Sequence, residues 1–382
     1  MKKICYVTTV HNTLNAFVID TAKYLHEQGG YDITFICDYD EEFERSLPDY
    51  INFIPVRMKR GIDLLGFRAV NKMKKIFKEN QFDMVQYSTP NASFYASIAA
   101  KKAGIPVRLY AQWGILYTGY FGLKRKIFKQ LEKTTCKNST WIEPDSFGNL
   151  EFSRQEGLYD QTNSSVIWNG SAKGIDLDRF DISQKEDWRK EIIEKYEYPE
   201  TDFVIGFVGR VTKDKGLNEL LTCLKGLDLE KKNITALMVG QNNKRNSVNP
   251  ILYKQSLMNK KIIYTERVND VEKHIAAMDV LVLPSYREGF GSVVIEAGAL
   301  GVPVVITNIP GPKEAVIDRV TGLITELGDV RGLFDALLYM YSFKEEAALM
   351  GEKGRQRVEE KFDANELKIK ILEDRNRLLN MG

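Results

Sequence analysis

The fold is decided by residues 280–303, whose sequence is VLVLPSYREGFGSVVIEAGALGVP. Its first four residues form an apolar run that is typical of a buried parallel strand. Two glycines follow in a short loop, and Ser292 is a suitable N-cap for a helix over residues 293–300. A strand that leads through such a loop into a helix is the repeating unit of parallel α/β sheets, so this stretch predicts an α/β fold.

The same loop has the features of an anion-binding site. The backbone N–H groups that begin a helix lack intrahelical partners, and the helix dipole adds partial positive charge at this end. Glu288 lies directly before the loop and Glu296 about one turn into the helix. Amides flanked by two carboxylates suit a ligand that is both a phosphate and a polyol. The alternative is an ordinary strand–loop–helix with surface glutamates.

Length and composition limit the class of protein. A chain of 382 residues favours two domains, and 43% hydrophobic with 28% charged residues is ordinary for a soluble protein. The net charge of +2 does not indicate a nucleic-acid partner. Four scattered cysteines favour a reduced cytoplasmic protein over a disulfide framework or a zinc site. The N-terminal apolar run is too short for a signal peptide, and no stretch approaches ~18 apolar residues.

The N-terminal half begins with a predicted strand over 4–10, a helix over 16–27 and a strand over 33–37, the pattern of a parallel sheet. Ligands bind such sheets beyond the carboxyl ends of the strands. The polar turn formed by His11, Asn12 and Thr13 is therefore a candidate site. No Gly-x-Gly-x-x-Gly follows this strand, which argues against a dinucleotide-dependent oxidoreductase.

Three more strands are predicted in this half, over residues 83–87, 107–111 and 140–143, and a last one over 166–168. Polar or aromatic side chains directly follow two of them. These are Gln112 and Trp113 after one strand and Asp145 after the other, and they join the candidates of the N-terminal half.

Two basic stretches interleave with apolar residues. Residues 57–78 hold eight Lys and Arg against one acid, Asp63, and a second stretch spans 124–137. A basic amphipathic segment is compatible with an anionic membrane surface, into which apolar neighbours such as Tyr120 and Phe121 could insert. The alternative is a surface helix whose apolar face fills the core. The basic and apolar residues of the first stretch are Arg57, Lys59, Arg60, Arg68, Lys72, Lys74, Lys75 and Lys78, with Ile62, Leu64, Leu65, Phe67, Val70, Met73, Ile76 and Phe77.

The C-terminal half restarts with a strand over 203–208 and a loop that ends at a helix. Arg210 in this loop can bind phosphate oxygens in a bidentate manner, and Lys215 adds a point charge. The alternative is a solvated surface loop. Further strands over 235–239, 262–265 and 304–307 predict a second α/β sheet, and residues 345–379 are expected to be helical throughout.

The order of these motifs resembles the nucleotide-sugar domain of family-4 retaining glycosyltransferases of the GT-B fold. The match over residues 203–325 rests on Glu288 and Glu296 as a Glu-x7-Glu motif, together with Gly209-Arg210, Lys215-Gly216 and Pro303. The segment 169–176, NGSAKGID, is similar to the members that build bacterial capsule and lipopolysaccharide O-antigen. The resemblance implies two Rossmann-like, doubly wound domains that face each other across a cleft.

The expected domains are an acceptor-binding domain over 1–180, a linker over 181–201 and a nucleotide-sugar domain over 202–360. A C-terminal helix over 361–382 is expected to cross back to the N-terminal domain. His11, Asn12, Thr13, Gln112, Trp113 and Asp145 would then lie on the acceptor side.

The resemblance also assigns roles in the donor site. Arg210 and Lys215 would hold the diphosphate, Glu288 the transferred sugar and Glu296 the ribose, with Glu288, Arg210 and Lys215 as the catalytic group. The rest of the donor set would be Gly209, the base-binding Arg267 and Val268, the loop residues Gly289 and Phe290, and the amides of Gly291, Ser292, Val293 and Val294. Two departures stand out: Glu266 replaces a frequent Gly, and Gln112-Trp113-Gly114 stands where many members have a His.

The expected reaction is retaining transfer of an N-acetylated hexosamine or galactose-type sugar from a UDP-sugar to a polyprenyl-diphosphate-linked saccharide. The enzyme would work without a metal or other cofactor at the inner face of the plasma membrane. The triplet Asp38-Tyr39-Asp40 could hold a divalent metal, but the acids that follow it favour a solvated turn. Two alternatives stay open: a UDP-sugar epimerase of the same fold, and a non-catalytic nucleotide-sugar-binding protein.

Overall fold

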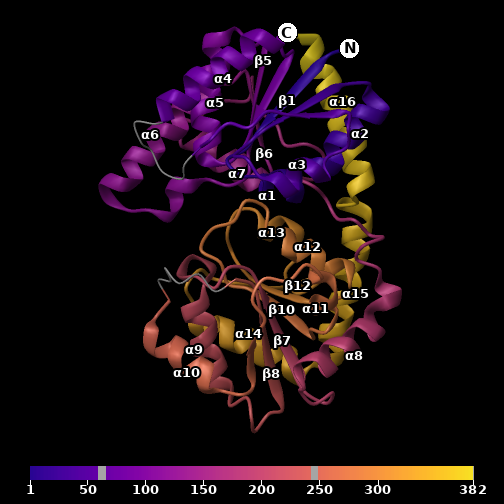
Figure 1. Cartoon of the computed structure of the whole chain (residues 1–382). Coiled ribbons are helices and arrows are strands. Elements are labelled where there is room, and N and C mark those ends of the chain that lie inside the picture. Colours follow the sequence, from indigo (N-terminus) through magenta and orange to yellow (C-terminus); the bar gives the residue numbers. More distant parts are fainter. Residues whose placement is uncertain (59–65, 242–247, 382) are drawn as a thin grey trace. The chain divides into compact units, whose positions relative to one another are not determined.

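The computed structural model describes residues 1–58, 66–241 and 248–381. The chain forms two compact units, each an α/β body of its own (Figure 1). The first unit comprises Met1–Lys173 with Asn365–Gly382, and the second comprises Gly174–Ala364.

The first unit is built on a six-stranded parallel sheet with the order β3-β2-β1-β4-β5-β6. Cys5 in the central β1 pairs with Thr34 of β2 on one side and Val85 of β4 on the other. The strand order reverses between β1 and β4, the point at which open parallel sheets bind ligands. The strands are β1 (Lys3–Val7), β2 (Asp32–Ile36), β3 (Ile51–Phe53), β4 (Met84–Tyr87), β5 (Val107–Gln112) and β6 (Trp141–Pro144).

Helices cover both faces of this sheet because successive side chains of a strand point to opposite faces. Ile4 and Tyr6 belong to the apolar cluster that includes residues of α2 and α16, and Cys5 and Val7 to the cluster of α4 and α5. The helices are α1 (His11–Phe17), α2 (Ile19–Gly29), α3 (Glu41–Ser46), α4 (Gly66–Asn80), α5 (Pro90–Ala103), η1 (Leu116–Gly119), α6 (Gly122–Asn138), α7 (Phe147–Gln155) and α16 (Ala364–Met381).

The second unit repeats this plan, with a six-stranded parallel sheet in the order β12-β11-β10-β7-β8-β9. Here the order reverses between β7 and β10, where Val280 pairs with Ile205. The strands are β7 (Phe203–Val208), β8 (Ile234–Val239), β9 (Ile262–Tyr264), β10 (Val280–Leu283), β11 (Val304–Thr307) and β12 (Gly322–Thr325).

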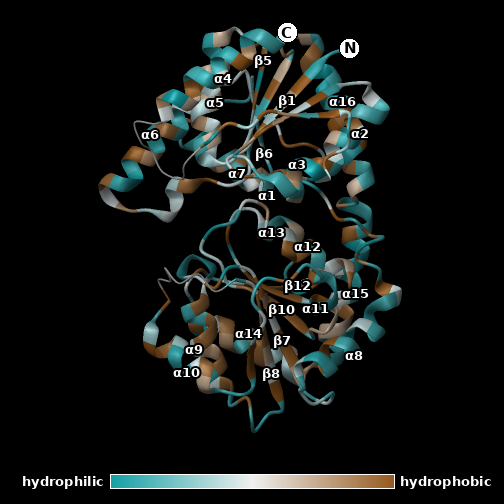
Figure 2. Cartoon of the chain, viewed as in Figure 1, coloured by the Kyte–Doolittle hydropathy of each residue, from teal (hydrophilic) through white to brown (hydrophobic). Residues whose placement is uncertain are grey.

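The strands of the second sheet are also buried on both faces, and Figure 2 shows them as hydrophobic arrows among helices with mixed surfaces. The doubly wound α/β prediction is therefore confirmed for both sheets. The helices of this unit are η2 (Ile182–Gln184), α8 (Lys185–Tyr196), η3 (Lys213–Lys215), α9 (Leu217–Leu227), α10 (Pro250–Met258), α11 (Val271–Ala276), α12 (Ser292–Ala299), α13 (Pro312–Ala315), α14 (Val330–Ser342) and α15 (Lys344–Lys361).

The segment 181–201 is an integral part of the second unit rather than the linker that the sequence suggested. Most of its charged residues are exposed, but Trp188 and Ile192 of α8 pack against the core of the sheet. Arg189 forms an ion pair of 3.2 Å with Asp279, directly before β10. The chain passes from the first unit to the second at Lys173–Gly174, ahead of the expected boundary at residue 180.

Local structure departs from the sequence-based expectation at several points. The expected polar turn at His11–Thr13 is the first turn of α1, and the expected strand over 166–168 is irregular, with Trp168 at a φ of 48°. The C-terminal helical stretch is divided at Phe362 into α15 and α16. Two short edge strands, β3 and β12, were not expected from the sequence.

The C-terminal helix α16 belongs to the first unit and is fixed there by a buried ion pair. The side chain of Arg375 is only 2% exposed, and its two terminal nitrogens lie 2.6 and 3.0 Å from the two carboxylate oxygens of Glu143 in β6. Gln86 of β4 accepts a further hydrogen bond of 3.2 Å from Arg375. These bonds join the helix to two strands of the sheet. The bonds to β6 require both the guanidinium charge of Arg375 and the carboxylate charge of Glu143.

Replacement of Arg375 should destabilise the first unit strongly. In Arg375→Met the carboxylate of Glu143 stays buried without its partner, and we expect the free energy of unfolding to fall by about 3–5 kcal/mol. Urea denaturation followed by circular dichroism measures the change. The control is Lys370→Met on the same helix, whose exposed pair with Glu373 should contribute less than about 1 kcal/mol. Equal unfolding midpoints for the two variants would contradict this role of the ion pair.

Candidate functional site

The second unit places the predicted donor residues at the carboxyl edge of its sheet, at the reversal point between β7 and β10. Arg210 and Lys215 follow β7, and Glu288 follows β10. Lys215 Nζ lies 2.5 Å from Glu288 Oε1, and the two side chains are only 17% and 12% exposed. Ser285 Oγ donates to the same carboxylate oxygen over 2.7 Å. The structure thus brings together a cation and a carboxylate that are far apart in the sequence.

Arg210 is held differently, by a carboxylate in its own loop. Its Nη2 lies 3.4 Å from Asp214 Oδ2, and the side chain is 54% exposed. Arg287 Nη2 approaches the same oxygen to 3.1 Å. Burial opposes the charge of Asp214, but a hydrogen bond with Thr212 and the positive charges around it hold the pKa of this carboxyl below its usual range.

Asp214 and Arg287 were not among the predicted site residues. Arg287 directly precedes Glu288, and Asp214 directly precedes Lys215. Their charge and their position next to motif residues could have indicated them as site residues. The sequence does not show, however, that the two side chains contact each other.

The loops of the site touch through bare backbone at two glycines. A Cβ on Gly216 would lie 1.9 Å from the carbonyl oxygen of Pro284, and a Cβ on Gly311 would lie 1.9 Å from that of Gly289. Both glycines have positive φ, 73° and 94°. No side chain fits at either position, so the loop after β10 is packed between the loops after β7 and β11.

The start of α12 differs in detail from the expectation. Its N-cap is Gly291, at a φ of 82°, and Ser292 is the first helical residue without a side-chain capping bond. The amide of Val294 already donates to the carbonyl of Gly291 over 2.9 Å, so its assignment to a ligand is wrong for this conformation. Ser292 and Val293 remain the candidate amides of the first turn, and the side chain of Glu296, one turn on, is 9% exposed.

Phe290 does not reach a ligand with its side chain, which is a further correction to the predicted donor set. The ring is 2% exposed and packs against Phe362 with 5.3 Å between the ring centroids. Its function in the site is to anchor the loop that carries Glu288 and Gly289.

The predicted base-binding segment lies next to the loops of β7 and β8. The amide of Gly240, after β8, donates to the carbonyl of Glu266 over 3.0 Å, and the amide of Gly209 donates to Val239 over 2.9 Å. Arg267 is exposed, whereas Val268 packs against the core. Glu266, at the position where the resembled family often has Gly, adopts a left-handed φ of 58°.

The candidates of the first unit lie at the carboxyl ends of its strands. His11 is in the first turn of α1, stacks on Phe43 and has its Nδ1 3.6 Å from Asp40 Oδ2. Asn12 is exposed and Thr13 is partly exposed. Asp40 is the N-cap of α3, which accords with the turn interpretation of the acidic triplet. Within residues 1–58, 66–241 and 248–381, no group of three or more His, Cys, Asp or Glu side chains could hold a metal ion.

Gln112 is not available to a ligand, which corrects its assignment. Its side chain is fully buried, with the amide nitrogen donating to Glu132 over 2.6 Å. The amide oxygen accepts from Tyr159 over 2.7 Å and from Ser153 over 3.2 Å. Burial raises the pKa of Glu132. The four side chains form one buried network that joins β5, α6 and α7.

Trp113 and Asp145 are also more enclosed than expected. The ring of Trp113 packs against Phe17 at 5.4 Å between centroids. Asp145 is 7% exposed, and its backbone carbonyl accepts from the amide of Ser171 over 2.7 Å. Among these candidates of the first unit, Asn12 is exposed, and His11, Thr13 and Trp113 are partly exposed.

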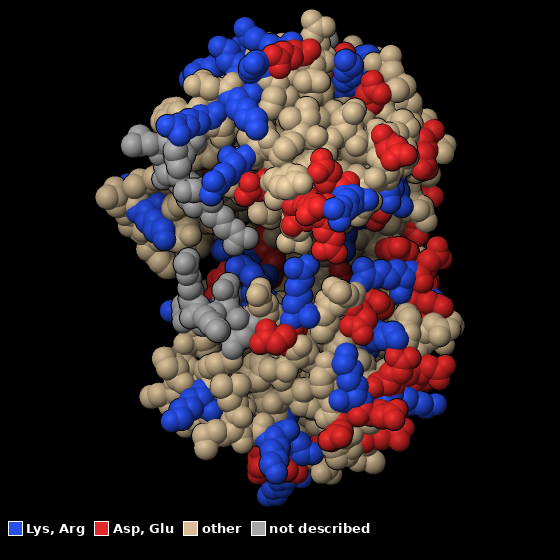
Figure 3. All heavy atoms as spheres, viewed as in Figure 1, with Lys and Arg blue, Asp and Glu red and all other residues tan. Residues whose placement is uncertain are grey.

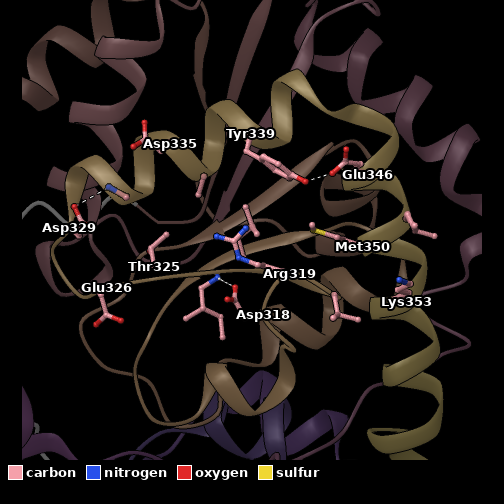
Figure 4. A pocket seen from close by; sticks show the side chains of 16 residues that line it. Asp318, Arg319, Thr325, Glu326, Asp329, Asp335, Tyr339, Glu346, Met350 and Lys353 are labelled. Carbon is pink, nitrogen blue, oxygen red and sulfur yellow. Dashed lines mark hydrogen bonds between the residues drawn. The ribbon is translucent and has the colours of Figure 1, made fainter.

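A groove with a volume of about 580 Å³ lies elsewhere in the second unit, between β12, α14 and α15 (Figure 4). None of the predicted site residues lines it. Its carboxylates are used inside the unit: Asp318 accepts from the amide of Ile324, Glu326 from Asn308, Asp329 from the amide of Gly332 and Glu346 from Tyr339, and Asp335 pairs with Arg331. The groove therefore receives no assignment.

The close contact at Gly311 yields a prediction for the sugar-transfer activity that the resemblance implies. Gly311→Ala must displace the carbonyl of Gly289 and with it the neighbouring Glu288, and we expect turnover to fall by about 10²-fold. The control is Gly301→Ala, which has a similar positive φ of 61° but a nearest contact of 3.7 Å. Turnover of a nucleotide sugar measures both variants. A loss in Gly301→Ala as large as in Gly311→Ala would show that backbone strain alone is responsible.

Comparison with known proteins assigns the two halves of the chain. The Glycosyl transferase 4-like family matches residues 3–146, and the Glycosyl transferases group 1 family matches residues 189–357. The chain is 29% identical over 365 residues to the capsular polysaccharide biosynthesis glycosyltransferase CapM of Staphylococcus aureus, with 95% of this chain and 94% of CapM covered.

A second relative is the UDP-Gal:alpha-D-GlcNAc-diphosphoundecaprenol alpha-1,3-galactosyltransferase of Escherichia coli. It is 26% identical over 320 residues, which cover 81% of this chain and 79% of the relative. Among solved structures, Anabaena HepE in complex with UDP and glucose matches with a TM-score of 0.80 at 20% identity, over 98% of this chain and 100% of that chain. These matches set aside the epimerase and the non-catalytic alternatives. The chain is a glycosyltransferase of the GT-B fold, with a Glycosyl transferase 4-like domain followed by a Glycosyl transferases group 1 domain.

Proposed function

We propose that this glycosyltransferase transfers a sugar from a UDP-sugar to a polyprenyl-diphosphate-linked saccharide in the assembly of a bacterial capsular or surface polysaccharide. The observation that carries the proposal is the cluster of Arg210, Lys215 and Glu288 beside the first turn of α12. The relatives support it, since CapM is named for capsule biosynthesis and the Escherichia coli relative for a UDP-galactose donor and an undecaprenol-diphosphate acceptor. The donor sugar would be an N-acetylated hexosamine or a galactose-type sugar.

The charges of the cluster suit a nucleoside-diphosphate leaving group. Negative charge on the departing phosphate grows as the bond to the sugar breaks, and preorganised cations and amides stabilise it at that stage. Arg210 and Lys215 supply the cations, and Ser292 and Val293 supply amides in the first turn of α12. Lys215 and Ser285 hold the carboxylate of Glu288, which would accept hydrogen bonds from the hydroxyls of the sugar.

The transfer would retain the configuration of the sugar, by attack from the same face as the leaving group. The acceptor hydroxyl oxygen forms a bond to the anomeric carbon, the bond from that carbon to the phosphate oxygen breaks, and the leaving phosphate takes the hydroxyl proton. No protein nucleophile takes part in this sequence. That the reaction needs no metal ion or other cofactor stays a prediction, tested by activity with and without a chelator.

Removal of either cation should slow transfer. We expect Arg210→Ala and Lys215→Ala each to reduce turnover by about 10²-fold, because each loses a charge-assisted contact that tightens in the transition state. The assay follows UDP release from UDP-GlcNAc, UDP-GalNAc and UDP-galactose with an undecaprenyl-diphosphate-linked saccharide, and NMR of the product reports the anomeric configuration. Lys225→Ala, at an exposed position of α9, is the control. Wild-type rates in both Arg210→Ala and Lys215→Ala would contradict the proposed site. A product with inverted anomeric configuration would contradict the proposed retention.

A lipid-linked acceptor requires that the enzyme reach a membrane surface. Among the described residues, no helix is both long and apolar enough to span a membrane. In α4 the apolar residues Val70, Met73, Ile76 and Phe77 are buried in the core, whereas Phe67 is 68% exposed. The basic residues of this helix are exposed or partly exposed. Figure 3 shows Lys and Arg gathered over this part of the first unit. The predicted apolar residues Ile62, Leu64 and Leu65, with Lys59, Arg60 and Asp63, lie outside the described residues.

The start of α6 offers both charge and apolar surface. Phe121 and Leu123 are 87% and 74% exposed, and Ile127 one turn later is 48% exposed. Lys124 lies over the ring of Tyr120 at 4.0 Å and is followed by two more basic residues. Exposed aromatic and aliphatic side chains among lysines are the composition of segments that insert shallowly into anionic bilayers. We therefore propose that this segment, with the basic face of α4, holds the enzyme at the cytoplasmic face of the membrane.

Vesicle sedimentation tests the membrane proposal. The protein should pellet with vesicles that contain anionic lipid at low salt and be released by high salt, because each basic residue contributes about 1 kcal/mol near such a surface. Phe121→Ser/Leu123→Ser, and separately Lys72, Lys74, Lys75 and Lys78 replaced by Glu, should each leave more protein in the supernatant. Lys101→Glu/Lys102→Glu, at exposed positions of α5, is the charge control. If the wild type does not pellet with anionic vesicles, or if both variants still pellet, these surfaces face water and do not bind the membrane.

A further inference from the structure

Arg287 and Asp214 form a second ion pair beside that of Lys215 with Glu288. Arg287 Nη2 lies 3.1 Å from Asp214 Oδ2, and Arg210 Nη2 lies 3.4 Å from the same oxygen. One carboxylate oxygen therefore faces two guanidinium groups, one from the loop after β7 and one from the loop after β10. The side chains of Arg287 and Asp214 are about one-third exposed, at 33% and 32%, so solvent and ligand can reach them.

The pair lies within the diphosphate site rather than beside it. Asp214 directly precedes Lys215, and Arg287 directly precedes Glu288, and these two neighbours are in contact at 2.5 Å. The backbone carbonyl of Asp214 also accepts from the amide of Tyr286 over 2.9 Å. Two ion pairs, Lys215 with Glu288 and Arg287 with Asp214, therefore link the same two loops side by side.

The residues that link these two loops carry one more positive than negative charge. A contact that only held the loops together would not need this excess. Three cations, Arg210, Lys215 and Arg287, face two carboxylates, and one of the carboxylates serves two arginines. A diphosphate brings at least two negative charges to the same cations. Since a guanidinium forms bidentate bonds with phosphate as readily as with carboxylate, Asp214 and the diphosphate are competing partners for the arginines.

We propose that Arg287 is a third cation of the diphosphate clamp and that Asp214 is its resident counter-anion, which holds Arg210 and Arg287 until the diphosphate replaces it. This inference rests on the proposed nucleoside-diphosphate donor. Before the donor binds, Asp214 holds the two guanidinium groups near one carboxylate oxygen and reduces their mutual repulsion. When the donor binds, the arginines exchange the carboxylate for phosphate oxygens.

The proposal predicts that loss of Arg287 and loss of the Asp214 charge change the affinity for a nucleoside diphosphate in opposite directions. Loss of Arg287 removes a phosphate contact and should weaken a nucleoside diphosphate without affecting the nucleoside. Loss of the charge of Asp214 removes both a competitor and a repulsive neighbour, and should strengthen the same ligand. A brace between loops would behave differently, because removal of either partner would disturb the site in the same direction.

Titration calorimetry with UDP and with uridine tests these signs. For Arg287→Met we expect UDP affinity to fall by about tenfold or more while uridine affinity stays unchanged, with partial recovery in Arg287→Lys, since one charge-assisted contact is lost. For Asp214→Asn, which keeps the shape of the side chain, we expect UDP to bind about threefold or more tightly. Arg331→Met is the control, because Arg331 is exposed on α14 and pairs with Asp335 of its own helix. Thermal unfolding confirms that each variant is folded.

The outcomes separate the inference from the proposed function. Unchanged UDP affinity in Arg287→Met, or weaker UDP binding in Asp214→Asn, overturns the inference and leaves the UDP donor intact. If the wild type binds GDP or ADP instead of UDP, the proposed donor is wrong. The same variants are then titrated with the nucleoside diphosphate that binds. A wild type that binds no nucleoside diphosphate overturns both.

Discussion

The close backbone contact between the loops of the second sheet is the constraint on which the site depends. Gly216 and Gly311 allow the loop after β10 to pack between its neighbours with no side chain in the way. Because the loops touch, Lys215 can reach Glu288, and Arg287 can reach Asp214, over bonding distances of 2.5 and 3.1 Å. A Cβ at either glycine would separate charges that act only at short range.

The strand order explains why these loops are neighbours at all. The strand order reverses between β7 and β10. The loops that follow these two strands therefore lie next to each other at the same edge of the sheet, although they are distant in the sequence. Arg210 and Lys215 follow the strand on one side of this point, and Arg287 and Glu288 follow the strand on the other. The chemistry of the donor site is therefore a product of topology as much as of motif.

The first unit uses polar residues in the opposite way. Gln112 and Glu132 are enclosed in a network with Tyr159, and Arg375 with Glu143 fixes the C-terminal helix to the sheet. The hydrogen bonds inside these groups bind most of their polar atoms to one another, which leaves those atoms unavailable to a ligand. The exposed apolar side chains of this unit include Phe67 in α4 and Phe121 and Leu123 at the start of α6.

The sequence by itself determined the class of fold, most of the central strands and the motif residues Arg210, Lys215 and Glu288, because strand periodicity and glycine-containing loops are local properties. It could not show that Lys215 pairs with Glu288, that Asp214 serves two arginines, or that the amide of Val294 is already bonded. Residues 181–201 were predicted to be a linker but belong to the second unit, and Gln112 was predicted to lie on the acceptor side but is fully buried. Those facts depend on which loops the sheet places side by side and on which polar groups are buried there, and tertiary packing alone decides both.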